Sequence, residues 1–446
     1  MALAIFVTAG CSLIDPPDGP VIPTPPPTIA AVNFSELPLV RNPVSSITPA
    51  VDPDIEALKN AVSTQQLTAY VQTLEGFGTR NSFSETQRDD FGVGAARRWI
   101  YDEFLRVNGG ALQVEYDDFP ATINGLTTNQ RNIIATLPGI GNHPGAIVLM
   151  AHYDSRPPDP NDGSSRAPGA DDNGSGVALL LELARLLSSR PWNQTIIFAA
   201  FAAEEQGTYG SRHFVQEKML EGRVFDAAID NDIVGGRVGI PQAIRLFSPG
   251  PDTTPSRQLG RYIDFVGGLY LPTFRVDMID ALDRVERYSD HREFINAGVA
   301  SVRLTESEED QDRQHSALDT TDQIDFDYLR QVVQLNLAVI ANLAGAPPPP
   351  IIPTIAPMAE PGAFIISWLP DQLAAGYAMS FRPLGSDELP PLRYVSAADA
   401  GNVALTGLDS GATYAVSIAA IDGNGRISAF SPEVIIGPGS ETISGN

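Results

Sequence analysis

The sequence is poor in cysteine, in lysine and in long apolar runs, and each shortage excludes a class of protein. A single cysteine, Cys11, rules out an internal disulfide framework. Lysine occurs only at Lys59 and Lys218 and the formal net charge is -25, so the chain repels phosphates and a role in binding nucleic acid is disfavoured. No run reaches the length of about 18 apolar residues typical of a membrane-spanning helix, so no such helix is predicted.

Two proline-rich segments divide the 446 residues and predict more than one domain. Residues 12–50 are predicted to be an extended tether, and a second proline run marks a linker at residues 346–353. Between them, residues 51–345 have the size of one large α/β domain. Residues 354–440 form a further domain, followed by a tail at residues 441–446.

Residues 1–11 resemble a lipoprotein-type signal segment. An apolar run at residues 3–10 ends in small residues directly before Cys11, where a bacterial lipoprotein is cleaved and acylated. Acylation of Cys11 would hold the chain on a membrane surface rather than through the membrane. The sequence therefore predicts an exported protein, either a cell-surface or periplasmic lipoprotein or a secreted one. The alternative is an N-terminal segment with an incidental cysteine.

Apolar strand-like runs alternate with helix patterns in the central block. Residues 146–150, 195–203 and 225–233 are apolar runs, and residues 177–187 repeat apolar side chains at helical spacing. This alternation predicts an α/β fold with a mostly parallel mixed sheet sandwiched by helices. Ligands of such sheets bind beyond the carboxyl ends of the strands, so the polar residues after each run are the candidates for a site.

Histidine and carboxylate residues occupy these strand ends. They fall in five short motifs, at residues 152–154, 169–176, 204–207, 232–235 and 315–320. One acidic residue at a strand end is usually a solvated turn. Five such motifs in succession predict a metal site, because imidazole and carboxylate are the ligands that suit zinc. His143 and His213 belong to no motif and are predicted to have no part in it.

In these motifs the sequence resembles the bacterial di-zinc aminopeptidase family, co-catalytic zinc exopeptidases with His, Asp, Glu, Asp and His ligands. The family pattern is His-x-Asp, Gly-Ala-x-Asp/Asn-x-x-Ser-Gly, Glu-Glu-x-Gly, Asp-x-Val-Gly and His-x-x-x-Asp-Thr, and all five elements occur in order within residues 130–345. The resemblance implies the zinc-exopeptidase fold for residues 51–345 and two Zn2+ ions per chain. It also implies hydrolysis of the first peptide bond of a peptide with a free N-terminus.

The resemblance further implies a role for each motif residue. The five ligands would be His152 and Asp232 on one ion, Glu205 and His315 on the other, and Asp171 bridging both. Glu204 would be the general base that moves a proton from the attacking water to the leaving amine. The two ions would polarise the scissile carbonyl and acidify the water. Because side chains alternate along a strand, the backbone must bend before Glu204 and Glu205 if both face the site.

Three more acidic residues are predicted to support the ligands, namely Asp154, Asp172 and Asp290. Asp154 lies two residues after His152, where it can accept the other imidazole N–H. Asp172 follows the predicted bridging residue, and Asp290 belongs to a Ser-Asp-His element similar to one near the family's metal pocket.

One position departs from the family. Several relatives have a tyrosine that donates a hydrogen bond to the developing oxyanion, and Gln314 stands at that position, which leaves Tyr288 as a substitute donor. Other reactions on the same fold stay open, namely carboxypeptidase action, which needs a basic carboxylate-binding pocket, and glutaminyl cyclisation with one zinc. A catalytically inert surface adhesion protein is a further alternative. The complete set of ligands and Glu204 argue against the cyclase and the inert protein.

The C-terminal domain has no chemical motif. Apolar and polar residues alternate between Gly- and Asp-containing turns, which predicts half-buried antiparallel strands. Residues 405–425 resemble part of a fibronectin type III domain, with Trp368, Leu408 and Tyr414 in its core. We therefore predict an all-β sandwich that serves as an accessory module.

Overall fold

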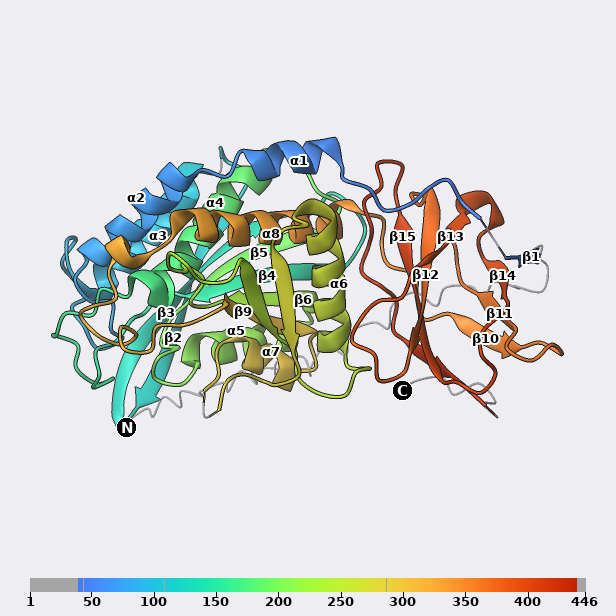
Figure 1. The fold of residues 1–446 in the computed structure, drawn as a ribbon. Coiled ribbons are helices and arrows are strands. Elements are labelled where there is room, and N and C mark those ends of the chain that lie inside the picture. Colours follow the sequence, from blue (N-terminus) through green and yellow to red (C-terminus); the bar gives the residue numbers. More distant parts are fainter. Residues whose placement is uncertain (1–38, 43, 108, 286, 439–446) are drawn as a thin grey trace, which may run out of the picture. The chain divides into compact units, whose positions relative to one another are not determined.

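The computed structural model describes the following residues of the chain: 39–42, 44–107, 109–285 and 287–438 (Figure 1). Cys11 and the predicted signal segment lie outside these ranges, so lipidation stays a prediction. Within the described ranges, no helix is both long and apolar enough to cross a membrane.

An eight-stranded mixed sheet forms the centre of the larger region (Figure 1). In spatial order its strands are β2 (Gln113–Ile123), β3 (Leu126–Leu137), β5 (Thr195–Phe201), β4 (Gly145–His152), β6 (Val224–Asn231), β9 (Ser301–Glu306), β7 (Ala243–Phe247) and β8 (Arg275–Ile279). The four neighbours β5, β4, β6 and β9 run parallel, whereas β2, β3 and β7 join through antiparallel pairs. The predicted mostly parallel mixed sheet is confirmed.

Helices cover both faces of this sheet. One face carries α1 (Pro53–Asn60), α2 (Thr64–Gly76), α3 (Gly92–Val107), α4 (Gly176–Leu187), α6 (Pro255–Tyr270) and α8 (Phe326–Gly345), and the other carries α5 (Tyr209–Leu220) and α7 (His291–Asn296). Strand β4 shows why its sequence is apolar throughout. Ile147 and Leu149 belong to the core beneath α4 and α8, while Val148 and Met150 belong to the core beneath α5 and α7. With both faces covered, a polar side chain is tolerated only at the strand end.

The C-terminal region consists of two four-stranded sheets. One contains β1 (Val40–Arg41), β14 (Asn402–Leu405), β11 (Phe364–Ser367) and β10 (Thr354–Pro357), and the other β13 (Arg393–Ser396), β12 (Gly376–Pro383), β15 (Tyr414–Ile421) and β16 (Val434–Ile436). Trp368 and Tyr377 lie in their apolar core with ring centroids 5.3 Å apart. The predicted all-β sandwich is confirmed as a fold class, and its likeness to fibronectin type III stays a prediction.

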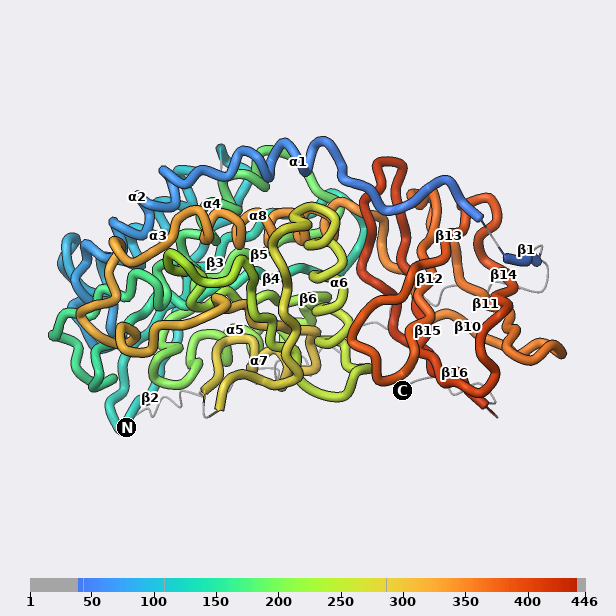
Figure 2. Tube along the Cα trace, in the orientation of Figure 1, coloured from blue at the N-terminus to red at the C-terminus, as the bar shows by residue number. Residues whose placement is uncertain are grey.

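The segment before α1 takes part in this β region. Strand β1 pairs in parallel with β14, and the Ala50 N–H donates a hydrogen bond to the Gly425 carbonyl. Figure 2 shows the same segment running from β1 over the C-terminal strands to α1. The predicted tether of residues 12–50 is therefore wrong for its last part, because these residues contribute a strand to the sheet.

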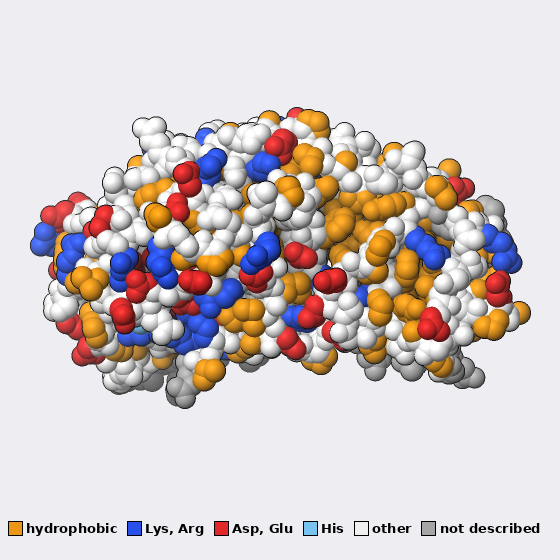
Figure 3. Space-filling model, viewed as in Figure 1, with side chains coloured by type: hydrophobic (Ala, Val, Ile, Leu, Met, Phe, Trp, Pro, Cys, Tyr) orange, Lys and Arg blue, Asp and Glu red, His pale blue; other side chains and the backbone are white. Residues whose placement is uncertain are grey.

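The two regions meet at helix α6. The Tyr262 hydroxyl donates a hydrogen bond to the Ile427 carbonyl at 2.8 Å, and Arg382 Nη1 lies 2.7 Å from Asp252 Oδ2. On the face shown in Figure 3, acidic and basic side chains are mixed despite the net charge of -25. The acidity of the chain is thus not gathered into one continuous acidic surface on that face.

Candidate metal centre

Five side chains from the motifs converge beyond the carboxyl ends of β4, β5 and β6. His152 ends β4, and its Nε2 lies 3.2 Å from Asp232 Oδ1 and 3.4 Å from Asp172 Oδ1. His315 Nε2 lies 3.1 Å from Asp172 Oδ2 and 3.3 Å from Glu205 Oε2. Asp172 therefore turns one carboxylate oxygen toward each histidine. Two groups of three potential metal ligands share this one residue.

The structure brings Asp172 rather than Asp171 into the cluster, so its geometry does not support the predicted bridging role of Asp171. The carboxylate of Asp171 accepts a hydrogen bond from the Gly235 N–H at 2.8 Å. Burial and the nearby carboxylate of Glu306 raise its pKa. Both aspartates belong to η2 (Ala170–Ser175), a π-helical turn with a cis peptide bond after Asp172. The turn sends the two adjacent side chains in different directions, which the motif alone does not reveal.

Two residues that the sequence analysis gave no role hold this turn in place. Asp319 accepts hydrogen bonds from the backbone N–H groups of Asp171 and Asp172 at 2.8 and 2.9 Å, one on each carboxylate oxygen. Arg80 is fully buried, and its guanidinium donates to the carbonyls of Tyr153 and Gly169. Asp319 belongs to the motif at residues 315–320, so the sequence contained a signal for it. No spacing pointed to Arg80, which lies far before the motifs.

The chain bends after β5 as the sequence analysis requires. Ala203 has φ 56°, in the left-handed region, and Glu204 and Glu205 both line the same cavity. The carboxylate of Asp154 accepts the backbone N–H groups of both glutamates at 3.1 Å. His152 Nδ1 is 3.1 Å from the Asp154 carbonyl oxygen and 3.6 Å from its carboxylate. Asp154 thus supports the bend as well as the histidine.

The electrostatics of the cluster favour a bound cation. Burial and the Asp172 carboxylate raise the pKa of Glu205 to about 7, and its buried Oε1 has no hydrogen-bond partner among the described residues. Burial also raises the pKa of Glu204, whose Oε2 lies 4.0 Å from His152 Nε2. Crowded buried carboxylates with an unsatisfied oxygen are costly unless a cation neutralises them. The histidine and carboxylate donors fit zinc.

Arg303 on β9 fixes the position of one candidate ligand. Its Nη2 lies 2.9 Å from Asp232 Oδ2 in the buried interior. Burial alone would raise the pKa of Asp232, but the Arg303 guanidinium and the His152 imidazole together outweigh it and lower that pKa to about 2. Asp232 is therefore a carboxylate, the form that binds metal, over the whole neutral range.

Asp290 and Gln314, which the sequence placed near the site, have the following surroundings. Asp290 is fully buried, and within the described residues we find no hydrogen bond or ion pair from its carboxylate to the five clustered side chains. Burial and the neighbouring Asp230 raise its pKa. Gln314 is engaged at both ends, since Oε1 accepts from Arg287 and Nε2 donates to Glu309. Tyr288, rather than Gln314, lines the cavity.

The cavity in front of the cluster has a volume of about 340 Å3. Its walls carry basic as well as acidic side chains, the basic ones being Arg156, Arg284, Arg287, Arg303 and His315.

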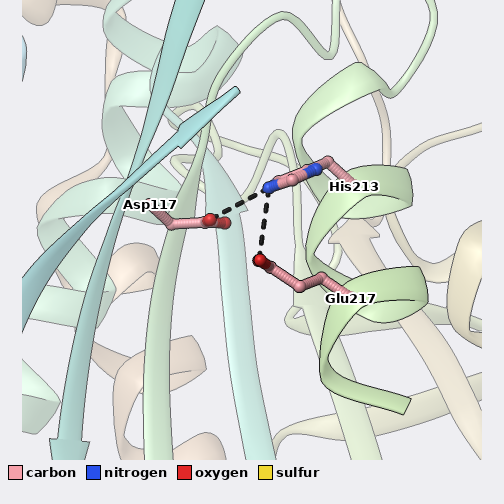
Figure 4. A group of neighbouring side chains, drawn as sticks. All are labelled: Asp117, His213 and Glu217. Atoms are coloured by element: carbon pink, nitrogen blue, oxygen red, sulfur yellow. Dashed lines mark hydrogen bonds and ion pairs between the residues drawn. The ribbon is translucent and has the colours of Figure 1, made fainter. Parts of the chain in front are cut away.

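A third group of histidine and carboxylate side chains lies on β2 and α5 (Figure 4). His213 Nε2 is 3.0 Å from Asp117 Oδ1 and 3.3 Å from Glu217 Oε2. The ring of His213 stacks on Phe119 with centroids 4.7 Å apart. We call Asp117, His213 and Glu217 the surface triad, because they are partly exposed and do not line the cavity.

Comparisons with known proteins agree with this site. The sequence model of Peptidase family M28 matches residues 132–340, which contain all five clustered side chains. A probable zinc metalloprotease of Pyricularia oryzae is 33% identical over 386 residues, covering 74% of this chain and 76% of the relative. The LapA aminopeptidase of Legionella pneumophila superposes with a TM-score of 0.54 at 21% identity. The match covers 66% of this chain and 75% of LapA. A glutaminyl cyclase of Porphyromonas gingivalis superposes with a TM-score of 0.51 at 22% identity. This match covers 63% of this chain and 98% of the cyclase.

Together the family match, the fungal relative and the donor set define a zinc metallopeptidase. The length and identity of the fungal match show that the chain belongs to peptidase family M28. The predicted family and fold class are confirmed. The solved structures share less than a quarter of their residues with this chain, so they show the fold alone.

Proposed function

We propose that this protein is a two-zinc aminopeptidase that removes the N-terminal residue of peptides. The observation that carries the proposal is the position of Asp172, with one oxygen 3.4 Å from His152 and the other 3.1 Å from His315. A carboxylate shared between two complete ligand groups suits two ions, whereas a one-zinc cyclase would have no use for the second group.

The chain's own residues supply the ligands and hold them in place. His152, Asp232 and Asp172 would hold one ion, and Glu205, His315 and Asp172 the other. When bound, the two ions polarise the scissile carbonyl and acidify a water. Arg156 Nε lies 2.8 Å from Glu205 Oε2 and orients that ligand from the cavity side.

Glu204 is the proposed general base. It is buried beside the cluster, and burial raises its pKa, so it holds a proton more readily than an exposed glutamate does. Its Oε2 would take a proton from the attacking water and pass it to the leaving amine nitrogen. Asp154 supports this role, because its carboxylate accepts a hydrogen bond from the Glu204 backbone N–H and so fixes the position of the Glu204 backbone.

A peptide panel on purified, zinc-loaded protein tests the proposal. We expect stepwise release of N-terminal residues from a free pentapeptide, about two zinc ions per chain by elemental analysis, and loss of cleavage when the N-terminus is acetylated. Amidation of the C-terminus of the same pentapeptide should leave cleavage unchanged. Equal cleavage of the acetylated peptide, or release from the C-terminus, would contradict aminopeptidase action.

The setting of the enzyme is a separate proposal from the sequence. We propose that Cys11 is acylated and anchors an exported protein to a membrane surface. Expression of the full chain and of Cys11→Ser with a radiolabelled fatty acid tests this. Label on the unaltered chain alone is expected, and equal labelling of both would contradict it.

A further inference from the structure

The arginines that line the cavity are not equivalent. Arg303 is buried and paired with Asp232 and Asp283, so its charge serves the structure of the cluster. Arg284 is paired with Asp283 and with Glu309, two carboxylates that do not themselves line the cavity. Both guanidinium groups are thus paired with Asp283, which does not line the cavity.

Arg287 differs from these two. Among the described residues, no carboxylate lies within ion-pair distance of its guanidinium. The partner we find for its side chain is the neutral amide of Gln314, whose oxygen accepts from Nη1 at 3.1 Å. Gln314 is held in turn by Glu309, so the amide fixes Arg287 without neutralising it. A positive charge is thereby placed in the cavity wall with no acidic partner among the residues that the structure describes.

The acidic side chains that line the same cavity have other uses. They are Asp172, Glu204, Glu205 and Asp232, the proposed ligands and the proposed base. Bound zinc would add positive charge to the cavity rather than remove it. An incoming anion would meet a favourable potential here.

We propose that Arg287 binds a carboxylate of the substrate, so that the enzyme prefers peptides that carry a carboxylate close to the bond it cleaves. This inference rests on the proposed aminopeptidase function. A guanidinium matches a carboxylate in shape and can donate two parallel hydrogen bonds to it. The carboxylate can come from two sources, the side chain of an N-terminal Glu or Asp residue or the C-terminus of a dipeptide.

Two matched substrate pairs separate these sources. Glutamyl- and glutaminyl-p-nitroanilide differ in a side-chain carboxylate, and Leu-Leu and Leu-Leu-amide differ in a C-terminal one. We expect kcat/KM to be about 10- to 100-fold higher for the charged member of one pair, the range typical of a hydrogen bond to a charged group. The pair that shows the preference identifies the source.

Variants of Arg287 test whether this residue causes the preference. Arg287→Leu should reduce the ratio to near one, and Arg287→Lys, which keeps the charge but not the planar fork, should retain part of it. Arg223→Leu is the control, because it removes an arginine charge from an exposed position that does not line the cavity. The control should keep the ratio, and leucyl-p-nitroanilide should be cleaved by all three variants.

Calorimetry keeps this test separate from the test of the proposed function. Binding of glutamate against glutamine, and of each Leu-Leu compound, is measured on the zinc-loaded full chain carrying Glu204→Gln. If leucyl-p-nitroanilide is cleaved but both ratios are near one, or Arg287→Leu leaves them unchanged, the carboxylate proposal is wrong and the aminopeptidase proposal stands. If no substrate with a free N-terminus is cleaved, the aminopeptidase proposal fails. Equal binding of charged and uncharged ligands then overturns the carboxylate proposal as well.

Discussion

The buried cluster and the surface triad have nearly the same spacing but different surroundings. In the cluster each histidine Nε2 lies 3.1 to 3.4 Å from two carboxylates, and in the triad the two distances are 3.0 and 3.3 Å. The side chain of His152 is 1% exposed, whereas that of His213 is 28% exposed. Spacing that suits a metal is therefore not what distinguishes the two groups.

Burial and unsatisfied oxygens distinguish them. In the cluster, Glu205 keeps a buried oxygen that finds no hydrogen-bond partner in the part of the chain that the structure describes. In the triad, both carboxylate oxygens of Asp117 have a partner. Oδ1 lies next to His213 Nε2, and Oδ2 accepts a hydrogen bond from the Asn132 amide at 2.8 Å. Water can also solvate the exposed Glu217 carboxylate. The cluster gains more from a bound cation than the triad does, because its carboxylates are more crowded and more deeply buried and one of their oxygens is unsatisfied among the described residues.

The largest effect is expected from removal of the proposed base. Glu204→Gln preserves the shape of the side chain but cannot accept a proton, so turnover should fall by about 10²- to 10⁴-fold or more. Zinc content should be unchanged, because the variant leaves all proposed ligands in place. Turnover from steady-state kinetics and zinc from elemental analysis check both statements. A variant that keeps most of its turnover, or that loses zinc, would show that Glu204 has another role.

The two adjacent aspartates of η2 test the proposal that Asp172 is shared between the two ions. Asp172→Asn should weaken zinc binding by more than the factor of about 10–100 typical of residues that only support ligands, because it alters both ligand groups. Asp171→Asn should keep the zinc content, since its carboxylate faces the Gly235 N–H. Competition with a chelator measures both affinities. The opposite ranking would restore Asp171 as the bridging ligand.

A smaller loss is expected at the residue that holds the bend after β5. In Asp154→Asn one side-chain oxygen remains and can still accept a hydrogen bond. The other oxygen, which accepts from a glutamate backbone N–H, is replaced by an NH₂ group. Two donors then face each other, so Glu204 and Glu205 should shift. We expect activity or zinc affinity to fall by about 10- to 100-fold. An unchanged kcat with unchanged zinc affinity would mean that the bend is held without Asp154.

Part of this site is readable in the sequence, and part is not. The apolar runs predicted β4, β5 and β6 because both faces of these strands are covered, and the motifs identified the histidines and Glu205 at their ends. The choice between Asp171 and Asp172 depends on the conformation of η2. That conformation is held by Arg80 and Asp319, which lie about 90 residues before and about 150 residues after the turn. Interactions over such separations leave no periodicity or motif in the chain.

The smallest effect is expected from a substitution in the surface triad. This substitution also tests directly whether the triad differs from the buried cluster. His213 belongs to none of the five motifs and was predicted to have no role in the site. It nevertheless lies four residues before Glu217 on α5, a spacing that places two side chains next to each other on a helix. His213→Gln removes the imidazole but keeps a hydrogen-bonding group next to Phe119. Partly exposed ion pairs contribute little, so the free energy of unfolding in urea should change by less than about 1 kcal/mol.

The zinc content of His213→Gln decides whether spacing or burial governs metal binding in this protein. We expect the same number of zinc ions in this variant as in the unaltered chain, and the same kcat, because the triad is solvated and lies outside the cavity. Asp117→Asn is a second variant that should behave alike. Loss of one zinc ion per chain from either variant, with kcat unchanged, would show that the triad is itself a metal site. Spacing would then be sufficient, and the distinction drawn here from burial would be wrong.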